Sequence, residues 1–392
     1  MYTTINRQSD MNYADLLDRS PVPFHLLVKP VGSSCNLACQ YCYYPQKDHT
    51  SGRMTDDVLK KFIEFYIRAQ PKTAKEINFV WQGGEPLLAG IEFYERAIRY
   101  QKMYQPAGVR ISNSMQTNGT MLNDEWCLFL KAQNFFVGIS TDGLEALHDQ
   151  HRVDKKNQPT FSKVIHGIEL LKRYHIEFNV LVVVHDETVP HFKEIYDFFD
   201  DHGIQFIQFQ PLMFEGDALK RSYTLSAKNW GDFLVNIYHY WQANRHQGRM
   251  FIMNLEHTYA QYFTNVSGTC VHAEYCGSNM ALEPDGNLYA CDHMINESHC
   301  VGKFTTQYQL IDSVKKAINL PFGNIKSQRT ECQTCSVKFL CNGGCPSHLD
   351  HSGKNHLCEG YYHFYSAMLD ELAKFNRDGM GLRQWQAQLK RP

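Results

Sequence analysis

The segment CNLACQYCYY begins at Cys35 and holds two further cysteines, Cys39 and Cys42, directly after the first predicted strand. Gaps of three and then two residues let three thiolates from one loop converge on a single metal centre, and thiolates favour iron–sulfur clusters, copper(I) or zinc. Three protein ligands on a four-iron cluster would leave one iron open for a substrate or cofactor, whereas a closed structural site usually has four. The spacing alone also allows a zinc site completed by His25 or His49, or three unrelated buried thiols.

Outward from this segment, the chain alternates strands with helices. Short runs of β-branched and aromatic residues predict six strands, over 24–31, 77–82, 110–116, 135–140, 176–185 and 204–210. Apolar residues at a 3.6-residue period predict helices over 56–69, 91–104, 124–132, 161–174, 189–202 and 226–243. This alternation indicates an α/β fold, either a doubly wound sheet or a full or partial (β/α) barrel, and periodicity does not separate the two. In both, the loops at the carboxyl ends of the strands carry the chemistry.

The pattern changes after about Phe251, where we expect helices to give way to glycines, cysteines and turns, including the turn Pro284–Gly286 between two short strands. A length of 392 residues suggests two to three domains. The predicted division is an N-terminal extension, an α/β barrel, a cysteine-rich domain and a helical tail, over 1–20, 21–250, 251–365 and 366–392.

The bulk composition excludes several classes of protein. Lys plus Arg (39) and Asp plus Glu (41) nearly cancel, so the chain lacks the basic footprint expected of a nucleic-acid partner. The first twenty residues are polar and unlike a secretory signal, and the longest apolar runs are too short to cross a membrane. These features predict a cytoplasmic protein. Because a reducing compartment disfavours disulfides, its thirteen cysteines indicate metal binding or catalysis.

Eight cysteines gather in the C-terminal half: Cys270, Cys276, Cys291, Cys332, Cys335, Cys341, Cys345 and Cys358. Eight thiolates are enough for two fully ligated four-iron clusters. The CxxC pair at Cys332 and Cys335 equally permits a pair of zinc ribbons. Of the two remaining cysteines, Cys127 reads as a small buried apolar residue on a helix, and Cys300 has no assigned role.

Smaller motifs follow the predicted strands. Gly83 and Gly84 could bring the backbone close to a ligand, although such pairs are usually plain turns. Ser140 ends the fourth strand, and Arg152 beyond it could hold a carboxylate through its fork of donors or be an ordinary surface residue. Asp292, directly after one of the cysteines, could accept a proton in an oxidation or simply cap a turn.

Together, these residues resemble a known family. The CxxxCxxC triplet with an aromatic residue before its last cysteine, followed by the GGEP motif at Gly83, resembles the radical S-adenosylmethionine (SAM) superfamily. The C-terminal half resembles the SPASM extension, which holds two auxiliary four-iron clusters. The order and spacing of the eight cysteines, with Asp292 after Cys291, are similar to anaerobic sulfatase-maturating enzymes, and most similar to the serine type.

The resemblance implies a partial barrel of six βα units, three [4Fe-4S] clusters and S-adenosyl-L-methionine as cofactors. The cluster that cleaves SAM would be held by Cys35, Cys39 and Cys42. Contacts to SAM would come from Tyr41, Gly84, Ser140, Arg152 and Met213. The sequence around Met213 differs from the one usual in the family. Auxiliary cluster one would take Cys270, Cys276, Cys291 and Cys345. Auxiliary cluster two would take Cys332, Cys335, Cys341 and Cys358. Asp292 would be the proton acceptor.

The implied reaction is oxidation of a serine or cysteine in an unfolded sulfatase segment to Cα-formylglycine, with flavodoxin or ferredoxin as electron donor. A first alternative is another SPASM peptide maturase, such as a thioether-forming one, although the extension before Pro21 is too short for a leader-recognition domain. A second, from another class, is a non-catalytic zinc-ribbon protein that binds a partner.

Overall fold

The computed structural model describes residues 19–44, 52–212, 224–244, 250–321, 326 and 329–377, with side chains up to 374 in the last stretch. A ten-stranded sheet runs through these residues in the order β10-β9-β8-β1-β2-β3-β4-β5-β6-β7. Its centre consists of the six predicted strands: β1 (His25–Val28), β2 (Glu76–Trp81), β3 (Arg110–Thr117), β4 (Phe135–Ser140), β5 (Phe178–Val184) and β6 (Phe206–Pro211).

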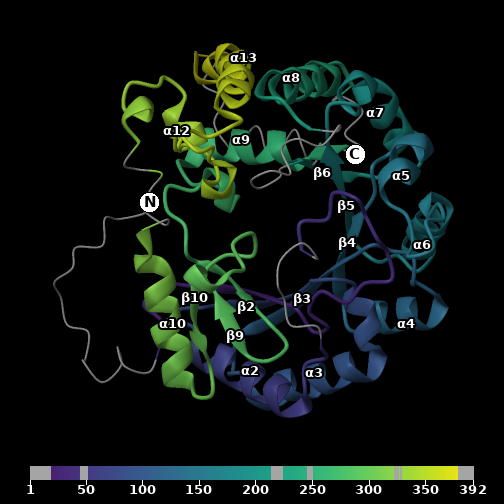
Figure 1. Ribbon diagram of the computed structural model, residues 1–392, viewed down its shortest axis with the longest axis vertical. Coiled ribbons are helices and arrows are strands. Elements are labelled where there is room, and N and C mark those ends of the chain that lie inside the picture. The colour runs from purple at the N-terminus through teal and green to yellow at the C-terminus, as the bar shows by residue number, and fades with distance from the viewer. Residues whose placement is uncertain are drawn as a thin grey trace.

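From β1 to β6 each strand pairs in parallel with the next one in the sequence. Between β1 and β6 the strand order does not reverse, so this part of the sheet has no topological switch point of the doubly wound kind. It curves around the interior with helices on its outside (Figure 1). The predicted partial barrel is therefore confirmed, and a short seventh strand, β7 (Phe251–Ile252), extends it in parallel beside β6.

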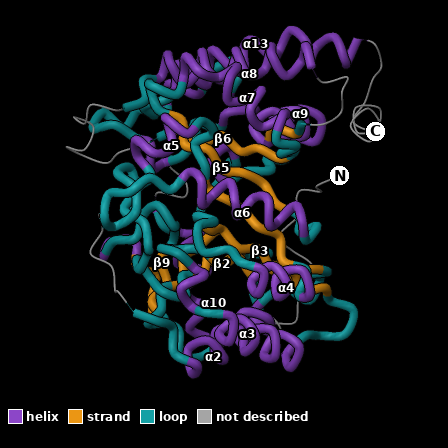
Figure 2. Tube along the Cα trace, turned by 90° about the vertical axis from the view of Figure 1, so that its right-hand side faces the viewer, coloured by secondary structure: helices purple, strands orange, loops and turns teal. Residues whose placement is uncertain are grey.

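Helices connect the strands of the barrel and cover its outer face (Figure 2). They are α2 (Asp56–Ala69), α3 (Ile91–Tyr104), α4 (Asp124–Ala132), α5 (Glu145–His151), α6 (Phe161–Arg173), α7 (Phe192–Asp201) and α8 (Ala227–Asn244), with 3-10 turns η1 (Pro86–Ala89) and η2 (Val189–His191). Side-chain caps fix where two of them begin. The Thr55 hydroxyl accepts from the backbone of Val58, and the Asn123 amide oxygen accepts from that of Trp126. Of these helices, α5 was not predicted from the sequence.

The C-terminal part contains more helix than the sequence predicted. Long helices form at α9 (Met253–Thr264) and α10 (Gln307–Asn319), so the expectation that helices give way after Phe251 was wrong. A third, α13 (Cys358–Arg377), overlaps the predicted helical tail but begins earlier. Capping partly explains why a helix forms here, because a capping box between Thr306 and Gln309 starts α10. Shorter turns also occur here: η5 (Cys270–His272), η6 (Glu297–His299), η7 (Thr330–Cys332), α12 (Lys338–Cys341) and η8 (Pro346–His348).

The two short strands around the Pro284–Gly286 turn are present as predicted, as β8 (Asn279–Leu282) and β9 (Asn287–Tyr289), followed by β10 (Cys300–Lys303). β8 pairs in parallel with β1, which joins the cysteine-rich region directly to the first barrel strand. The sheet is thus continuous across residue 250, and the division into domains at that point stays a prediction.

The last helix is fixed to the barrel by two glycines. A Cβ on Gly231 of α8 would lie 2.8 Å from the Cα of Gly360 in α13, so only glycines allow the two helices to pack this closely. Figure 2 shows α8 and α13 side by side at the top of the molecule. This contact holds Cys358, the first residue of α13, near the barrel.

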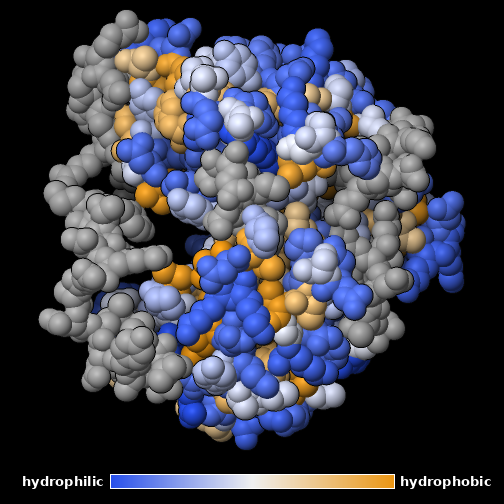
Figure 3. All heavy atoms as spheres, turned by 60° about the vertical axis from the view of Figure 1, so that its left-hand side comes forward, coloured by the Kyte–Doolittle hydropathy of each residue, from blue (hydrophilic) through white to orange (hydrophobic). Residues whose placement is uncertain are grey.

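The face of the molecule in Figure 3 is mostly hydrophilic, with apolar residues gathered between its upper and lower parts. Among the described helices, none has the length and apolar character needed to cross a bilayer.

Candidate active site

The loop with the first three cysteines is clamped between its neighbours through backbone hydrogen bonds. On one side, the amides of Gly84 and Glu85 donate to the carbonyls of Gly32 and Ser34, both at 2.8 Å. On the other, the amide of Gln40 donates to the carbonyl of His151 at 2.9 Å. The loop is therefore tied both to the residues after β2 and to the end of α5.

Gly84 is required here for a steric reason. A Cβ at this position would overlap the backbone of Ser33 and Ser34, and no flexible side chain is available to move aside. The glycine of the GGEP motif thus lets the loop after β2 lie directly against the cysteine loop. Glu85, the next residue, is fully buried and accepts hydrogen bonds from the backbone amide of Asn118 at 2.8 Å and the hydroxyl of Thr117 at 2.7 Å.

The three thiols of this loop share one site. Burial raises the pKa of Cys35, Cys39 and Cys42, to about 11 for Cys42, and the charges of the other two add to the increase at Cys42. The Sγ of Cys35 also accepts a hydrogen bond from the backbone amide of Leu37 at 3.4 Å. Three partly buried thiols this close together become stable thiolates only beside compensating positive charge, which a bound metal centre supplies. The donor set therefore fits an iron–sulfur cluster.

A buried polar cluster lies beside the triplet. The Tyr41 hydroxyl donates to Asp142 at 2.5 Å, and Nη1 of Arg152 donates to the Tyr41 oxygen at 3.1 Å. Within the described part of the chain, Nε of Arg152 has no hydrogen-bond partner although it is buried. The guanidinium thus has donor capacity left for a ligand, and its burial contradicts the interpretation of Arg152 as a surface residue.

Ser140 ends β4, and its hydroxyl accepts a hydrogen bond from the Gln116 amide at 3.0 Å. Met213 lies outside the described residues.

Asp292 occupies a buried position in which both carboxylate oxygens have polar partners. Its Oδ1 is 2.5 Å from Nζ of Lys29, and its Oδ2 accepts from the Tyr43 hydroxyl at 2.7 Å and from Gln82 at 2.9 Å. Burial would raise the pKa of Asp292, but Lys29, the neighbouring His293 and Tyr43 lower it to about 2. The carboxylate is therefore ionised at neutral pH and can accept a proton.

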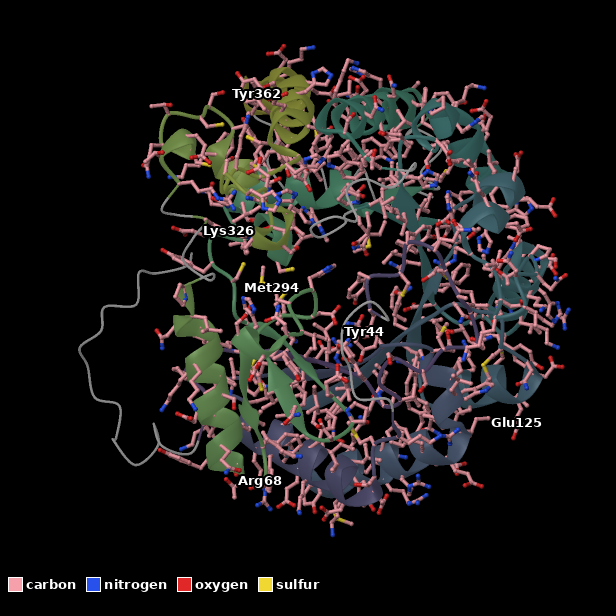
Figure 4. The ribbon with its side chains drawn as sticks, viewed as in Figure 1. Tyr44, Arg68, Glu125, Met294, Lys326 and Tyr362 are labelled. Atoms are coloured by element: carbon pink, nitrogen blue, oxygen red, sulfur yellow. The ribbon has the colours of Figure 1, made fainter. Side chains whose placement is uncertain are left out.

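Tyr43 and Tyr44 line the space between the triplet and Asp292. The ring of Tyr44 lies under Nζ of Lys29, 4.0 Å from its centroid, and the Tyr44 hydroxyl donates to Glu283 at 2.8 Å. Tyr44 and Met294 both lie toward the interior, between the lower and upper helices of the view (Figure 4). Tyr44 also forms a small buried cluster with Ala281 and Ile295, against which Tyr43 packs.

The eight C-terminal cysteines separate into two groups in space. Cys270, Cys276 and Cys291 each have a pKa raised first by burial and then by the charge of Cys345, so these four lie together. Nearby, Nζ of Lys326 donates to three backbone carbonyls of the Cys270 loop, at 2.8 to 2.9 Å. This lysine fixes the loop and places a positive charge beside its thiols.

The other four cysteines line one cavity. Its walls include Cys332, Cys335, Cys341 and Cys358, and Nη1 of Arg329 fixes its rim by donating to the carbonyl of Gly343 at 2.6 Å. The two spatial groups have the memberships that the family resemblance implies. Cysteine spacing alone did not yield this grouping, because Cys345 joins the first group although Cys332, Cys335 and Cys341 of the second group precede it in the chain.

Two cysteines lie outside all three groups. Cys127 is fully buried on α4, in agreement with its interpretation as a small apolar residue, and Cys300 is exposed on β10. Sequence reasoning missed Lys29 and Asp142, which contact Asp292 and Tyr41. Lys29 could have been noticed in the sequence, because it is a charged residue directly after a strand that is predicted to be buried.

Comparison with known proteins agrees with this arrangement. Residues 30–199 match the radical SAM superfamily. A serine-type anaerobic sulfatase-maturating enzyme of Klebsiella aerogenes is 53% identical over 94% of this chain and 91% of its own length. The chain belongs to the family of anaerobic sulfatase-maturating enzymes. Another serine-type member, from Bacteroides thetaiotaomicron, is 35% identical over 88% of the chain and 89% of its own length.

Solved structures place the fold in the same family. The anSMEcpe enzyme with bound AdoMet and the Kp18Cys peptide is 31% identical, with a TM-score of 0.82 over 91% of this chain and 99% of that one. Streptococcus suis SuiB bound to its precursor peptide SuiA matches at 14% identity with a TM-score of 0.59, over 86% and 74%, and shows the fold alone. As a radical SAM enzyme, the chain uses a [4Fe-4S] cluster and SAM.

Proposed function

We propose that this enzyme oxidises a specific serine or cysteine of an unfolded sulfatase polypeptide to Cα-formylglycine without oxygen. The observation that carries this proposal is the position of Asp292. It accepts a hydrogen bond from Tyr43, the residue after the triplet's Cys42, and it directly follows Cys291 of the first C-terminal group. A single ionised carboxylate thus lies between the two predicted cluster sites. An oxidation of this kind needs a base that accepts the substrate's proton close to the centre that accepts its electron.

The proposed ligand sets are those of the family, and the spatial groups support them. Cys35, Cys39 and Cys42 would hold the SAM-cleaving cluster, and the two groups of four would hold one auxiliary cluster each, three clusters in all. When bound, the cluster and SAM supply one-electron cleavage of a carbon–sulfur bond and a carbon radical that can remove hydrogen from the Cβ of the target residue.

The chain's own residues position the cofactor and the substrate. Arg152 has a free buried donor and would hold the SAM carboxylate, while Tyr41 fixes its guanidinium. Tyr41 itself, the Gly84 backbone and Ser140 would supply further contacts, as would Met213. Asp292 would take the hydroxyl or thiol proton of the substrate, and the rings of Tyr43 and Tyr44 would keep water from the reacting carbon.

Flavodoxin or ferredoxin is the proposed electron donor. The reaction also predicts that the substrate segment enters unfolded, since the target Cβ must reach a buried carboxylate. A location in the cytoplasm stays a prediction from the sequence.

A substitution in the triplet tests the cofactor assignment. Cys35→Ala should abolish 5'-deoxyadenosine formation and remove about four iron atoms per chain, while the auxiliary iron stays. Cys300→Ala is the matched control, because this thiol is exposed and outside all three groups, and it should retain full activity and iron. Equal iron loss in both variants would contradict the assignment.

The substrate is tested by anaerobic incubation with paired serine and cysteine peptides copied from a sulfatase. Mass spectrometry should show a loss of about two hydrogens from the serine peptide and conversion of the target residue to an aldehyde. Deoxyadenosine release with neither peptide modified would reject the proposed substrate while leaving the cofactor chemistry intact.

A further inference from the structure

A second group of potential metal ligands lies outside the cysteine sites. It consists of His151 at the end of α5 and of His185 and Glu187 directly after β5 (Figure 1). We propose that these three side chains form a binding site for a zinc ion, separate from the iron–sulfur sites and independent of the proposed substrate.

The distances suit a single small cation. Nε2 of His151 is 3.4 Å and Nδ1 of His185 is 3.7 Å from Oε2 of Glu187, and one ligand atom from each of the three residues lies within 4.8 Å of the other two. Zinc bonds of roughly 2.1 Å to nitrogen and oxygen place tetrahedral ligands about 3.4 Å apart. The three atoms therefore need to move little to surround one ion, and a fourth position remains open.

His185 lacks the partners that a buried imidazole normally has. It is fully buried, and within the described residues neither of its ring nitrogens makes a hydrogen bond. Burial, followed by the nearby His151, lowers the pKa of His185 to about 4, so the ring is neutral and has a lone pair available at neutral pH. Leaving such a ring unpaired costs free energy, and coordination to a cation would recover it.

The surrounding residues orient the ligands as in known metal sites. Oε1 of Gln40 is 3.3 Å from Nδ1 of His151 and can accept its proton, which places the lone pair of the ring on Nε2, the nitrogen that faces Glu187. The amide of Gln150 donates to Oε2 of Glu187 at 3.0 Å. Metal-bound imidazoles and carboxylates usually have such outer partners, which fix the tautomer and the direction of the lone pair.

The ligand chemistry favours zinc over harder or softer ions. Two imidazoles and a carboxylate are a common set for zinc with an open position, whereas magnesium and calcium prefer oxygen ligands alone and copper(I) prefers thiolates. The ion would tie the end of α5 to the loop after β5. Arg152 is the next residue after His151, and Gln40 lies within the cysteine triplet, so the ion would also steady the proposed SAM contacts.

The test measures metal content and coordination in the intact enzyme. Anaerobically purified holoenzyme is given one equivalent of zinc and dialysed against a weak chelator, and zinc, iron and sulfide are then determined together. We expect about one zinc per chain with nitrogen and oxygen neighbours at about 2.0 to 2.1 Å in the zinc-edge X-ray absorption spectrum. A sulfur shell would place the zinc at the cysteines and overturn the proposal.

Variants locate the site. Glu187→Gln changes a half-exposed side chain, should fold normally, and should weaken zinc binding at least tenfold with iron and sulfide unchanged. His185→Phe should abolish binding. The matched control is His191→Ala, because His191 is 3.9 Å from Glu194 in an exposed pair without a third ligand in the described chain. Equal zinc retention in the wild type, Glu187→Gln and His185→Phe, or equal loss in His191→Ala, would overturn the proposal.

Discussion

Lys29 and Asp292 form a buried ion pair, with 2.5 Å between Nζ and Oδ1, that joins the end of β1 to the loop after β9. The lysine side chain is completely buried and that of the aspartate is 12% exposed, so the pair is almost fully removed from water. The lysine keeps the proposed proton acceptor charged and holds it near the end of the cysteine triplet, where Tyr43 contacts it. The same contact therefore serves both the chemistry of Asp292 and the attachment of the C-terminal region to the barrel.

Asp292→Asn tests the role of this carboxylate. The amide keeps the shape and can still accept from Tyr43 and Gln82, but it cannot take a proton. We expect all three clusters to be retained and peptide oxidation to fall by about 10²- to 10⁴-fold, the range typical of a lost general base. Product aldehyde and deoxyadenosine are measured in parallel, and deoxyadenosine should continue to form without oxidised peptide. Wild-type oxidation in this variant would show that another group accepts the proton.

Lys29→Met tests the ion pair itself. Removing one partner leaves a buried uncompensated charge at Asp292, which typically costs about 3 to 5 kcal/mol. The double variant Lys29→Met with Asp292→Asn removes both charges and should recover most of that loss. Thermal midpoints of the wild type and both variants, measured without oxygen, give the comparison. The iron content shows whether the clusters are retained. If the double variant is no more stable than Lys29→Met alone, the cost comes from the lost contact between the Lys29 ammonium and the Tyr44 ring.

The barrel could be predicted from the sequence because its signals are local. The 3.6-residue period and the flanking turns placed α2, α3 and α4 at their observed bounds. α5 was missed because it is short and its buried residues include His148 and His151, so no apolar stripe marks it. α13 overlaps the helical tail predicted over 366–392, but its start at Cys358 was missed because that segment has the cysteines and turns of a loop region.

The site could be predicted only in part. The triplet is visible because its three ligands are adjacent in the sequence, and Asp292 because it follows a cysteine. The roles of three other residues depend on partners far away in the sequence, and the hydrophobic pattern does not predict such contacts. These residues are Lys29, Asp142 and His185. Motif resemblance supplied the membership of the two C-terminal cysteine groups, since their pairing crosses the sequence order.

Gly84→Ala tests how the GGEP loop supports the triplet. The added methyl group would overlap the backbone of Ser33 and Ser34, so the cysteine loop must shift. We expect loss of the triplet's cluster, about four iron atoms per chain, with the auxiliary iron retained. Gly52→Ala is the control, because a Cβ there meets open space. Full iron and normal deoxyadenosine formation in Gly84→Ala would show that the loop tolerates the shift.

Glu256 in α9 gives a prediction about pH and stability. Burial raises the pKa of this carboxyl to about 7 from its ordinary 4.5, and its Oε1 has no hydrogen-bond partner among the described residues. The folded state therefore binds more protons than the unfolded state between about pH 4.5 and 7, and stability falls as the pH rises through that window.

Glu256→Gln removes the charge at every pH, so the variant should match the wild type near pH 5 and be more stable at pH 8, by up to about 3 kcal/mol. The gain has this sign because the ionised carboxylate is the form that burial disfavours, and glutamine never ionises. Glu92→Gln is the control, an exposed glutamate that, like Glu256, lies in the first turn of its helix. Thermal midpoints at both pH values, taken without oxygen on cluster-loaded protein, give the comparison. A gain that is equal at pH 5 and pH 8, or one shared by Glu92→Gln, would mean that the Glu256 carboxyl does not titrate in this window.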